Sequence, residues 1–113
     1  MHEMALAQSV LEIVEATARR HAAQRVTAVR LEIGVLSHVA PEALEFCFGA
    51  VTRGSLAERA RLEIETTPGA AWCVPCGETV ALSTLGAPCP QCGSYQLAVS
   101  QGDAMRVIDI EVA

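Results

Sequence analysis

The chain has 113 residues, of which 51% are hydrophobic and 4% aromatic, and it carries a net charge of −5. That length fits one compact domain with at most a small appended module, and that apolar fraction excludes a disordered chain. All eight basic residues are arginines scattered along the sequence, so they form no basic patch for a phosphate backbone. We therefore expect a folded protein that does not bind nucleic acid.

The sequence also lacks targeting and membrane signals. No apolar run approaches the roughly 18 residues of a membrane-spanning helix, so we expect no membrane span. The first residues, Met1-His2-Glu3-Met4, lack the charged and apolar regions of a signal peptide. We therefore expect a cytoplasmic protein, whose five cysteines serve as metal ligands or free thiols rather than in disulfides.

The first half of the chain alternates between helix and strand patterns. Apolar residues recur at three- and four-residue steps over residues 4–21, which predicts a first helix. Residues 26–35 alternate in polarity, with Val29, Leu31, Ile33 and Val35 on one face, which predicts a half-buried strand. Pro41 suits the first turn of a second helix over residues 41–52. Ser55-Leu56-Ala57-Glu58 reads as a capping box, so a short further turn is expected there.

The second half holds two more strands and a different kind of segment between them. Polarity alternates over residues 61–66 and again over residues 105–112, and both patterns predict strands. The intervening residues 67–102 are rich in Gly, Pro and Cys. We predict an α+β fold, with a small three-stranded sheet, two main helices and an inserted zinc-ribbon-like module of four cysteines. The expected domains are residues 1–66 and 103–113 together, interrupted by residues 67–102.

Four of the five cysteines form two copies of one local pattern, Cys73-Val74-Pro75-Cys76-Gly77 and Cys89-Pro90-Gln91-Cys92-Gly93. Two thiolates two residues apart bind one metal from a tight turn, and two such turns supply the four ligands of a tetrahedral zinc site. The 12 residues from Gly77 to Pro88 are enough for a hairpin that folds one turn onto the other. Four thiolates leave no open position for water, so we expect structural zinc and no catalysis.

Two alternatives for these cysteines remain, an iron–sulfur cluster and a thioredoxin-like dithiol, although the strand and helix expected around a dithiol motif are missing. Cys47 stands apart from both pairs, on the apolar stripe of the second predicted helix. We expect it to act there as a small hydrophobic side chain.

The N-terminus offers a different metal chemistry. The Met1 amine, the amide nitrogen of His2 and its imidazole can chelate one ion in adjacent rings, and Glu3 can supply a fourth nitrogen or oxygen. Square-planar nitrogen sites select Ni(II) or Cu(II). Position alone leaves open that His2 is an ordinary exposed side chain without a metal.

The order of these features resembles the HypA/HybF family of nickel metallochaperones for [NiFe]-hydrogenase maturation. The resemblance rests on Met1-His2-Glu3, the strand Val29-Arg30-Leu31-Glu32-Ile33-Gly34, the paired cysteine motifs and the ending Ile108-x-Ile110-Glu111-Val112. It implies a nickel site at Met1, His2 and Glu3, a structural zinc at Cys73, Cys76, Cys89 and Cys92, and no enzymatic activity. It also implies delivery of Ni(II) to the hydrogenase large-subunit precursor together with a HypB-type GTPase, and in some relatives to the urease pathway.

Three other classes of function were weighed. A nucleic-acid-binding zinc ribbon needs basic and aromatic residues near the cysteines, yet residues 67–102 contain no Arg or Lys and only Trp72 and Tyr95 as aromatics. A zinc enzyme needs an open ligand position, which four cysteines do not leave. An adaptor with structural zinc alone is the main alternative, and nickel titration distinguishes it from a chaperone.

Overall fold

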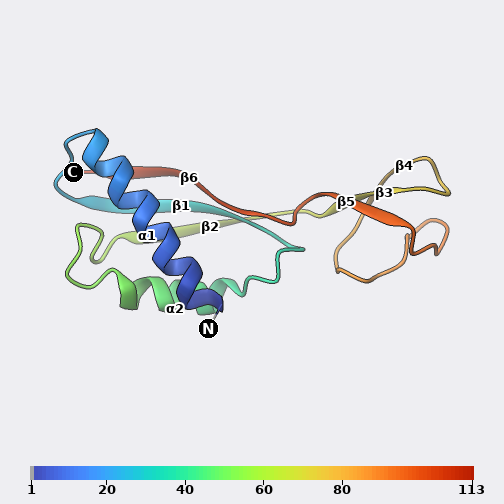
Figure 1. Ribbon diagram of the computed structural model, residues 1–113, viewed down its shortest axis with the longest axis horizontal. Helices are drawn as coiled ribbons and strands as arrows, with labels where there is room; N and C mark the ends of the chain where they lie inside the picture. The colour runs from blue at the N-terminus through green and yellow to red at the C-terminus, as the bar shows by residue number, and fades with distance from the viewer. Residues whose placement is uncertain (1) are drawn as a thin grey trace. The chain divides into compact units, whose positions relative to one another are not determined.

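A computed structural model describes residues 2–113 of the protein, and they divide into two compact units (Figure 1). Unit 1 comprises residues 2–31, Val39–Glu65 and Arg106–Ala113, and unit 2 comprises Glu32–His38 and Thr66–Met105. No helix among the described residues is long and apolar enough to cross a membrane.

Unit 1 holds both helices. The first, α1 (His2–Arg20), buries one stripe at helical spacing, which consists of Ala7, Val10, Leu11, Val14 and Ala18. Arg19 and Arg20 lie in its last turn, where positive charge is favourable beside the free carbonyl groups. The second helix, α2 (Pro41–Val51), starts with proline in its first turn and buries Leu44, Cys47 and Phe48. The two helices pack against each other, and the predicted helices are confirmed.

Three long strands form one sheet in the order β2-β1-β6. They are β1 (Val26–Gly34), β2 (Arg61–Thr67) and β6 (Met105–Val112), as the alternating patterns predicted. Figure 1 shows β1 and β2 pointing the same way and β6 the opposite way, with α2 in the connection between the parallel pair. The α+β fold with two helices and a three-stranded sheet is therefore confirmed.

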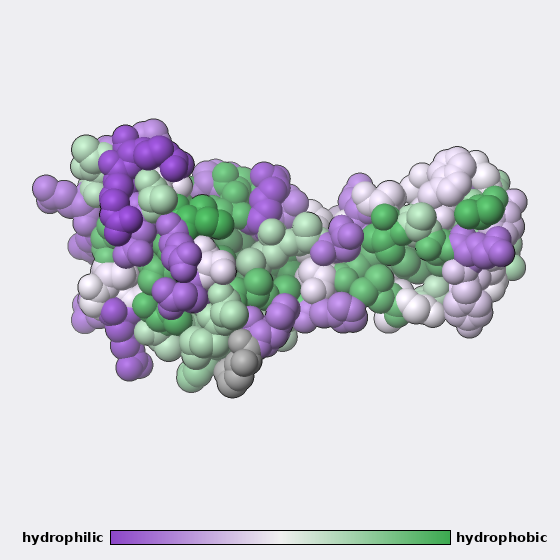
Figure 2. All heavy atoms as spheres, viewed as in Figure 1, coloured by the Kyte–Doolittle hydropathy of each residue, from purple (hydrophilic) through white to green (hydrophobic). Residues whose placement is uncertain are grey.

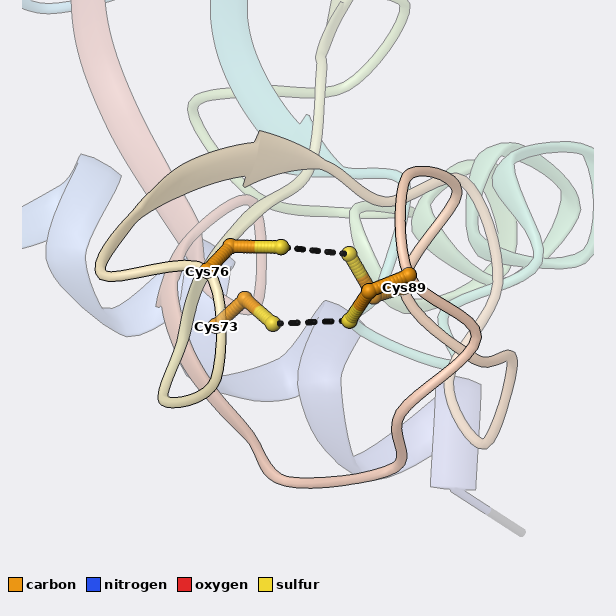
Figure 3. Close-up of side chains that lie close together, drawn as sticks. Cys73, Cys76 and Cys89 are labelled. Carbon is orange, nitrogen blue, oxygen red and sulfur yellow. Dashed lines mark hydrogen bonds between the residues drawn. The ribbon is translucent and has the colours of Figure 1, made fainter.

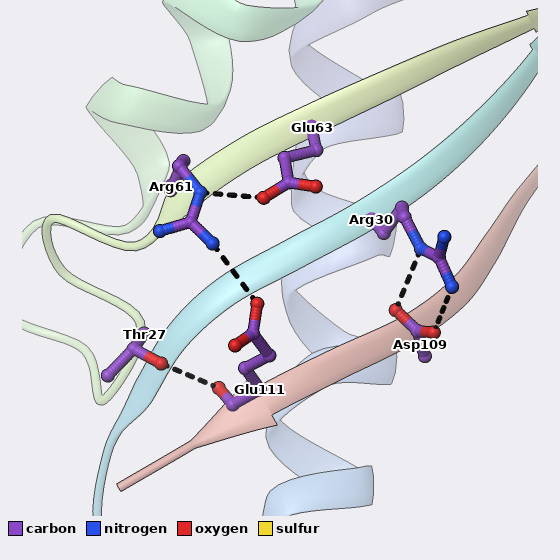
Figure 4. A network of polar contacts seen from close by, with 6 residues as sticks. All are labelled: Thr27, Arg30, Arg61, Glu63, Asp109 and Glu111. Carbon is purple, nitrogen blue, oxygen red and sulfur yellow. Dashed lines mark hydrogen bonds and ion pairs between the residues drawn. The ribbon is translucent and has the colours of Figure 1, made fainter.

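The face of this sheet opposite to α1 carries paired charges (Figure 4). Arg30 donates from Nε to Asp109 over 3.1 Å and lies 3.2 Å from the Glu65 carboxylate. Arg61 donates to Glu63 and, from Nη2, to Glu111 over 3.1 Å. Because each guanidinium reaches two carboxylates from different positions, the exposed face of the sheet is covered by a charge network.

Two local predictions in this region need correction. Val35 was expected to point inward with Ile33, but its side chain is 45% exposed, whereas Leu36 is only 2% exposed. The alternation is interrupted because β1 ends at Gly34 and a turn follows, in which the Ser37 amide donates to the Gly34 carbonyl over 3.0 Å.

The expected capping box at Ser55 forms only in part. The Ser55 hydroxyl accepts the Ala57 amide over 3.1 Å, as a cap should. The Ser55 amide, however, donates to the Thr52 carbonyl over 3.0 Å rather than to the Glu58 side chain. The segment after α2 nevertheless consists of turns, as predicted.

Unit 2 contains a second sheet that the sequence pattern did not reveal. Its strands are β3 (Ala70–Cys73), β4 (Glu78–Ala81) and β5 (Leu97–Gln101), paired antiparallel in the order β4-β3-β5. Two small clusters of buried residues lie in this unit. One contains Leu36, Ala71 and Leu82, and the other contains Cys73, Val80 and Cys89.

Three glycines lie in contact where separate passes of the chain cross in unit 2. A Cβ atom on Gly34 would collide with the Gly102 carbonyl, and one on Gly102, whose φ is +86°, would lie 2.6 Å from the Gly69 Cα. The Leu36 amide also donates to the Gly102 carbonyl over 2.7 Å. Only residues without a side chain allow three backbones to approach this closely. We call this contact the glycine crossing.

Candidate metal centre

The four cysteines of the two repeated motifs lie together in unit 2. Their Sγ atoms are all within 4.8 Å of one another. Cys73 Sγ lies 3.5 Å from Cys92 Sγ, and Cys76 Sγ lies 3.9 Å from Cys89 Sγ. Figure 3 shows Cys73, Cys76 and Cys89 directing their sulfur atoms toward one small volume. Within residues 2–113, these four cysteines are the one cluster of potential ligand side chains (Cys, His, Asp or Glu) that could hold a metal ion.

Both motifs build the same turn. The Gly77 amide donates to the Cys73 carbonyl over 2.9 Å, and the Gly93 amide donates to the Cys89 carbonyl over the same distance. The two glycines have φ values of +67° and +76°, which explains why a glycine follows the second cysteine of each pair. The Gln91 amide points at the Cys89 sulfur, 3.4 Å away, as expected of a turn that stabilises a thiolate.

The hairpin of this site differs from the predicted one. We expected a hairpin within the residues that separate the two motifs, but these residues contain only one strand, β4. The hairpin instead pairs β3 with β4, in the register Cys73 to Glu78, and the first cysteine turn is its loop. The second cysteine turn immediately precedes the segment that leads into β5.

The local environment shifts the pKa values of Cys73, Cys76 and Cys89 in different directions. Burial raises the pKa of Cys73, and hydrogen bonding to Cys92 and Cys73 together with burial raises the pKa of Cys76. Burial also opposes ionisation of Cys89, but the backbone N–H groups of Cys92 and Gln91 outweigh it and lower the pKa of Cys89 to about 7. Without a cation, close packing thus keeps some of the thiols protonated. A divalent ion would reverse that preference, because it binds the thiolate form.

Two of the distances between sulfur atoms are close to those of a zinc site. Zn–S bonds of about 2.3 Å at tetrahedral angles place sulfur atoms about 3.8 Å apart. The two sulfur–sulfur distances of 3.5 and 3.9 Å lie on either side of that value. Cys73 and Cys89 are buried, Cys76 is partly buried and Cys92 is exposed, so the cluster lies at the edge of unit 2.

The predicted nickel ligands are the first three residues of the sequence. Met1 is outside the described residues. His2 and Glu3 form the first turn of α1, with the His2 Nδ1 atom 3.5 Å from the Glu3 carboxylate. The His2 side chain is 60% exposed and therefore accessible to an ion. Cys47 is buried on α2 in unit 1, as predicted for a small hydrophobic side chain, whereas the cysteine cluster belongs to unit 2.

Two long-range contacts could not be predicted from the sequence. The Glu3 carboxylate accepts the Ala40 amide over 3.3 Å, just before α2 begins. This hydrogen bond is the main reason why the pKa of Glu3 is lowered, and it attaches the first turn of α1 to α2. The second contact is that of Leu36, which packs in unit 2. In the sequence, residues Val39–Glu65 of unit 1 separate it from the cysteine segment. No pattern in the sequence signals either long-range contact.

The fold and the four-cysteine cluster define a small two-unit protein with a site that could hold a metal ion. A family model described as "Hydrogenase/urease nickel incorporation, metallochaperone, hypA" matches residues 1–112. The chain therefore belongs to the HypA family of nickel metallochaperones, as the resemblance predicted.

Individual relatives agree with this assignment. The chain is 55% identical over 112 residues to the hydrogenase maturation factor HypA of Rhodopseudomonas palustris strain BisB5, and 56% identical to that of Dechloromonas aromatica strain RCB. In both cases 99% of each chain is covered. The solution structure of the Ni metallochaperone HypA from Helicobacter pylori matches with a TM-score of 0.71 at 23% identity, covering 97% of this chain and 96% of that one. At that identity the structural match supports the fold alone.

Proposed function

We propose that this protein binds one Ni(II) ion at Met1, His2 and Glu3 and delivers it for [NiFe]-hydrogenase maturation. The receiving protein is the hydrogenase large-subunit precursor, a HypB-type GTPase assists the transfer, and the process takes place in the cytoplasm. The protein itself performs no catalysis. In this proposal residues 1–66 and 103–113 carry the nickel-binding domain and residues 67–102 the zinc module, to whose core Leu36 of the first segment also contributes.

The observation that carries the nickel site is the position of α1, which begins at His2. The first amide groups of any α-helix have no acceptor within the helix, so the amides of His2 and Glu3 can act as ligands without breaking helical hydrogen bonds. Helical backbone angles also turn successive nitrogens toward the same side. The exposed His2 imidazole lies beside them. The start of α1 is therefore already close to the conformation that a chelate of consecutive nitrogens needs.

Charge favours the same arrangement. A bound Ni(II) ion displaces two amide protons, so the ion with two amide anions and a neutral amine carries no net charge. Placing a neutral complex at the N-terminus of a helix avoids the repulsion that a bare cation would meet there. Binding should strengthen as pH rises, because the amine, with a reference pKa of ~7.7–8, and the amides must both lose protons.

For the four cysteines we propose a structural zinc ion. The sulfur distances support it, as does the small size of the two buried clusters in unit 2. Cys73, Cys76, Cys89 and Cys92 would hold the ion, which would supply folding free energy and no reaction, because four thiolates leave no position for a substrate.

The deciding experiment is a calorimetric Ni(II) titration of the untagged protein and three variants. One variant carries a glycine before Met1, the second is His2→Ala, and the third, His21→Ala, is the control, because His21 follows the opposite end of α1. The first two changes should abolish tight binding, and the control should bind like the native protein. Unchanged affinity in the glycine-extended protein would disprove an amine ligand. Absence of nickel binding in the native protein would favour an adaptor with zinc alone.

A further inference from the structure

The outer face of the small sheet in unit 2 has an unusual composition. Residues directly paired across antiparallel strands point to the same side. Trp72 pairs with Thr79 on β4 and with Ala98 on β5. Ala70 pairs with Ala81 and, across a register shift between Ala70 and Ala71, with Gln101. Their neighbours Ala71 and Val80 are buried, so these six residues form the opposite, outward face. We call it the Trp72 face; its members are Ala70, Trp72, Thr79, Ala81, Ala98 and Gln101.

No member of the Trp72 face is charged, and its central side chain is a tryptophan that remains 46% exposed. The residues that pair with Trp72, Thr79 and Ala98, are small and exposed, so the indole projects farther from the sheet than its neighbours. The outward face of the other sheet, with its network around Arg30 and Arg61, shows what a solvated sheet face in this protein looks like. In Figure 2 unit 2 is mainly white and green, whereas purple residues gather over unit 1.

The charge of unit 2 restricts what can cover this face. Glu32, Glu78 and Asp103 are its charged residues, and it contains no Arg or Lys. Four thiolates around a divalent ion would add two further negative charges. Nucleic acid and anionic membranes would therefore be repelled. A second copy of this chain, with its own net charge of −5, would be repelled as well.

We propose that the Trp72 face is the docking surface for a partner protein whose contact region is apolar at its centre and rich in Lys or Arg at its rim. The half-exposed indole is the anchor, because tryptophan is the side chain that most often dominates the energy of a protein interface. The acidic character of unit 2 attracts the basic rim and speeds encounter. A face of six residues is much smaller than the ~20–30 residues per side of a stable complex, which suits a transient contact.

This inference rests on the proposed function for its two candidate partners, the hydrogenase large-subunit precursor and the HypB-type GTPase. The test uses the zinc-loaded, ¹⁵N-labelled full chain and each purified, unlabelled partner, followed by amide chemical shifts. At least one partner should shift the signals of Trp72, Thr79 and Ala98. Its affinity should fall when salt is raised from about 0.05 to 0.3 M, because screening weakens charge attraction.

Variants make the test specific. Trp72→Ala and Ala98→Arg should each weaken binding at least about tenfold, a loss of ~1.4 kcal/mol. Tyr95→Ala is the matched control, since Tyr95 is an aromatic residue of the same unit, 72% exposed and outside the Trp72 face. It should bind within about twofold of the native protein. Zinc content should stay unchanged in all three variants, which excludes a folding defect.

Other results would overturn the inference. Binding of neither partner, or chemical-shift changes confined to unit 1, would contradict it. Equal losses of affinity in Trp72→Ala and Tyr95→Ala would do the same. Chemical-shift changes that depend on the concentration of this chain alone, or that phosphatidylserine vesicles cause, would show that the face binds a second copy or a membrane instead. None of these results bears on nickel binding, because the Ni(II) titration is performed without a partner. Failure of the docking inference and failure of the proposed nickel site are therefore separable.

Discussion

The two units reach stability by different means. Unit 1 buries an apolar stripe of α1, three residues of α2 and the central strand β1, including Val26, Val29 and Leu31 at 0% exposure. Unit 2 has two small clusters, and one of them consists largely of the cysteines themselves. From this comparison we expect unit 1 to fold through hydrophobic burial alone, and unit 2 to need the proposed metal ion as part of its core.

The largest expected effect follows from removing a metal ligand. Cys89→Ser should unfold unit 2 and leave unit 1 folded, because zinc binding supplies about 10–16 kcal/mol in comparable small modules. Amide spectra and zinc content measured on the same sample would show this. A matched change, Ser94→Ala, should leave both unchanged, although the Ser94 hydroxyl accepts the Gln96 amide. A native-like spectrum of unit 2 in zinc-free Cys89→Ser protein would contradict the comparison.

A pair of leucine substitutions sharpens the contrast. Leu36 is 2% exposed in unit 2 and Leu44 is 0% exposed in unit 1, so each Leu→Ala change should cost about 2–5 kcal/mol in its own unit. Hydrogen exchange should show faster exchange in unit 2 for Leu36→Ala and in unit 1 for Leu44→Ala. If Leu36→Ala instead left the amides of β3 and β4 fully protected, Leu36 would not belong to the core of unit 2.

A smaller effect is expected at Cys47, which is buried in unit 1 and takes no part in the cysteine cluster. Cys47→Ala should reduce the free energy of unfolding of unit 1 by ~1 kcal/mol, through a small cavity. Zinc and nickel stoichiometry, measured by metal analysis, should not change. Loss of one metal equivalent would show that the division into four ligands and one core cysteine is wrong.

The smallest effect concerns the charge network of the sheet. The Arg30 guanidinium, through its hydrogen bonds, lowers the pKa of Asp109. The pKa of the Asp109 carboxyl is therefore lower in the folded state than in the unfolded state. The ion pair stabilises the fold above the unfolded pKa of about 3.9, and this stabilisation is lost as pH falls through the folded-state pKa. Asp109→Asn should make the melting temperature of unit 1 less dependent on pH below about 4. An unchanged acid dependence would show that solvent screens the pair completely.

Much of this architecture could be predicted because its signals are local. The turns at Cys73 and Cys89 are encoded by five-residue motifs, and α1 by a long stripe of helical period. The strands β3 and β4 were missed because four residues give too little alternation, and Ala70 and Ala71 look alike although only one is buried. The position of Leu36 in unit 2 and the hydrogen bond from Ala40 to Glu3 depend on residues distant in sequence, which no local pattern specifies.

The glycine crossing has a consequence for the order in which the chain folds. Gly34, Gly69 and Gly102 are about a third of the chain apart, so bringing them together closes two long loops, and loop closure costs entropy that grows with length. All four clustered cysteines lie in the second loop. A metal ion held by these cysteines would join Cys73 to Cys92 across most of that loop, so little free chain would be left to close. Zinc binding is therefore expected to come first on the folding pathway, with the crossing closing after it.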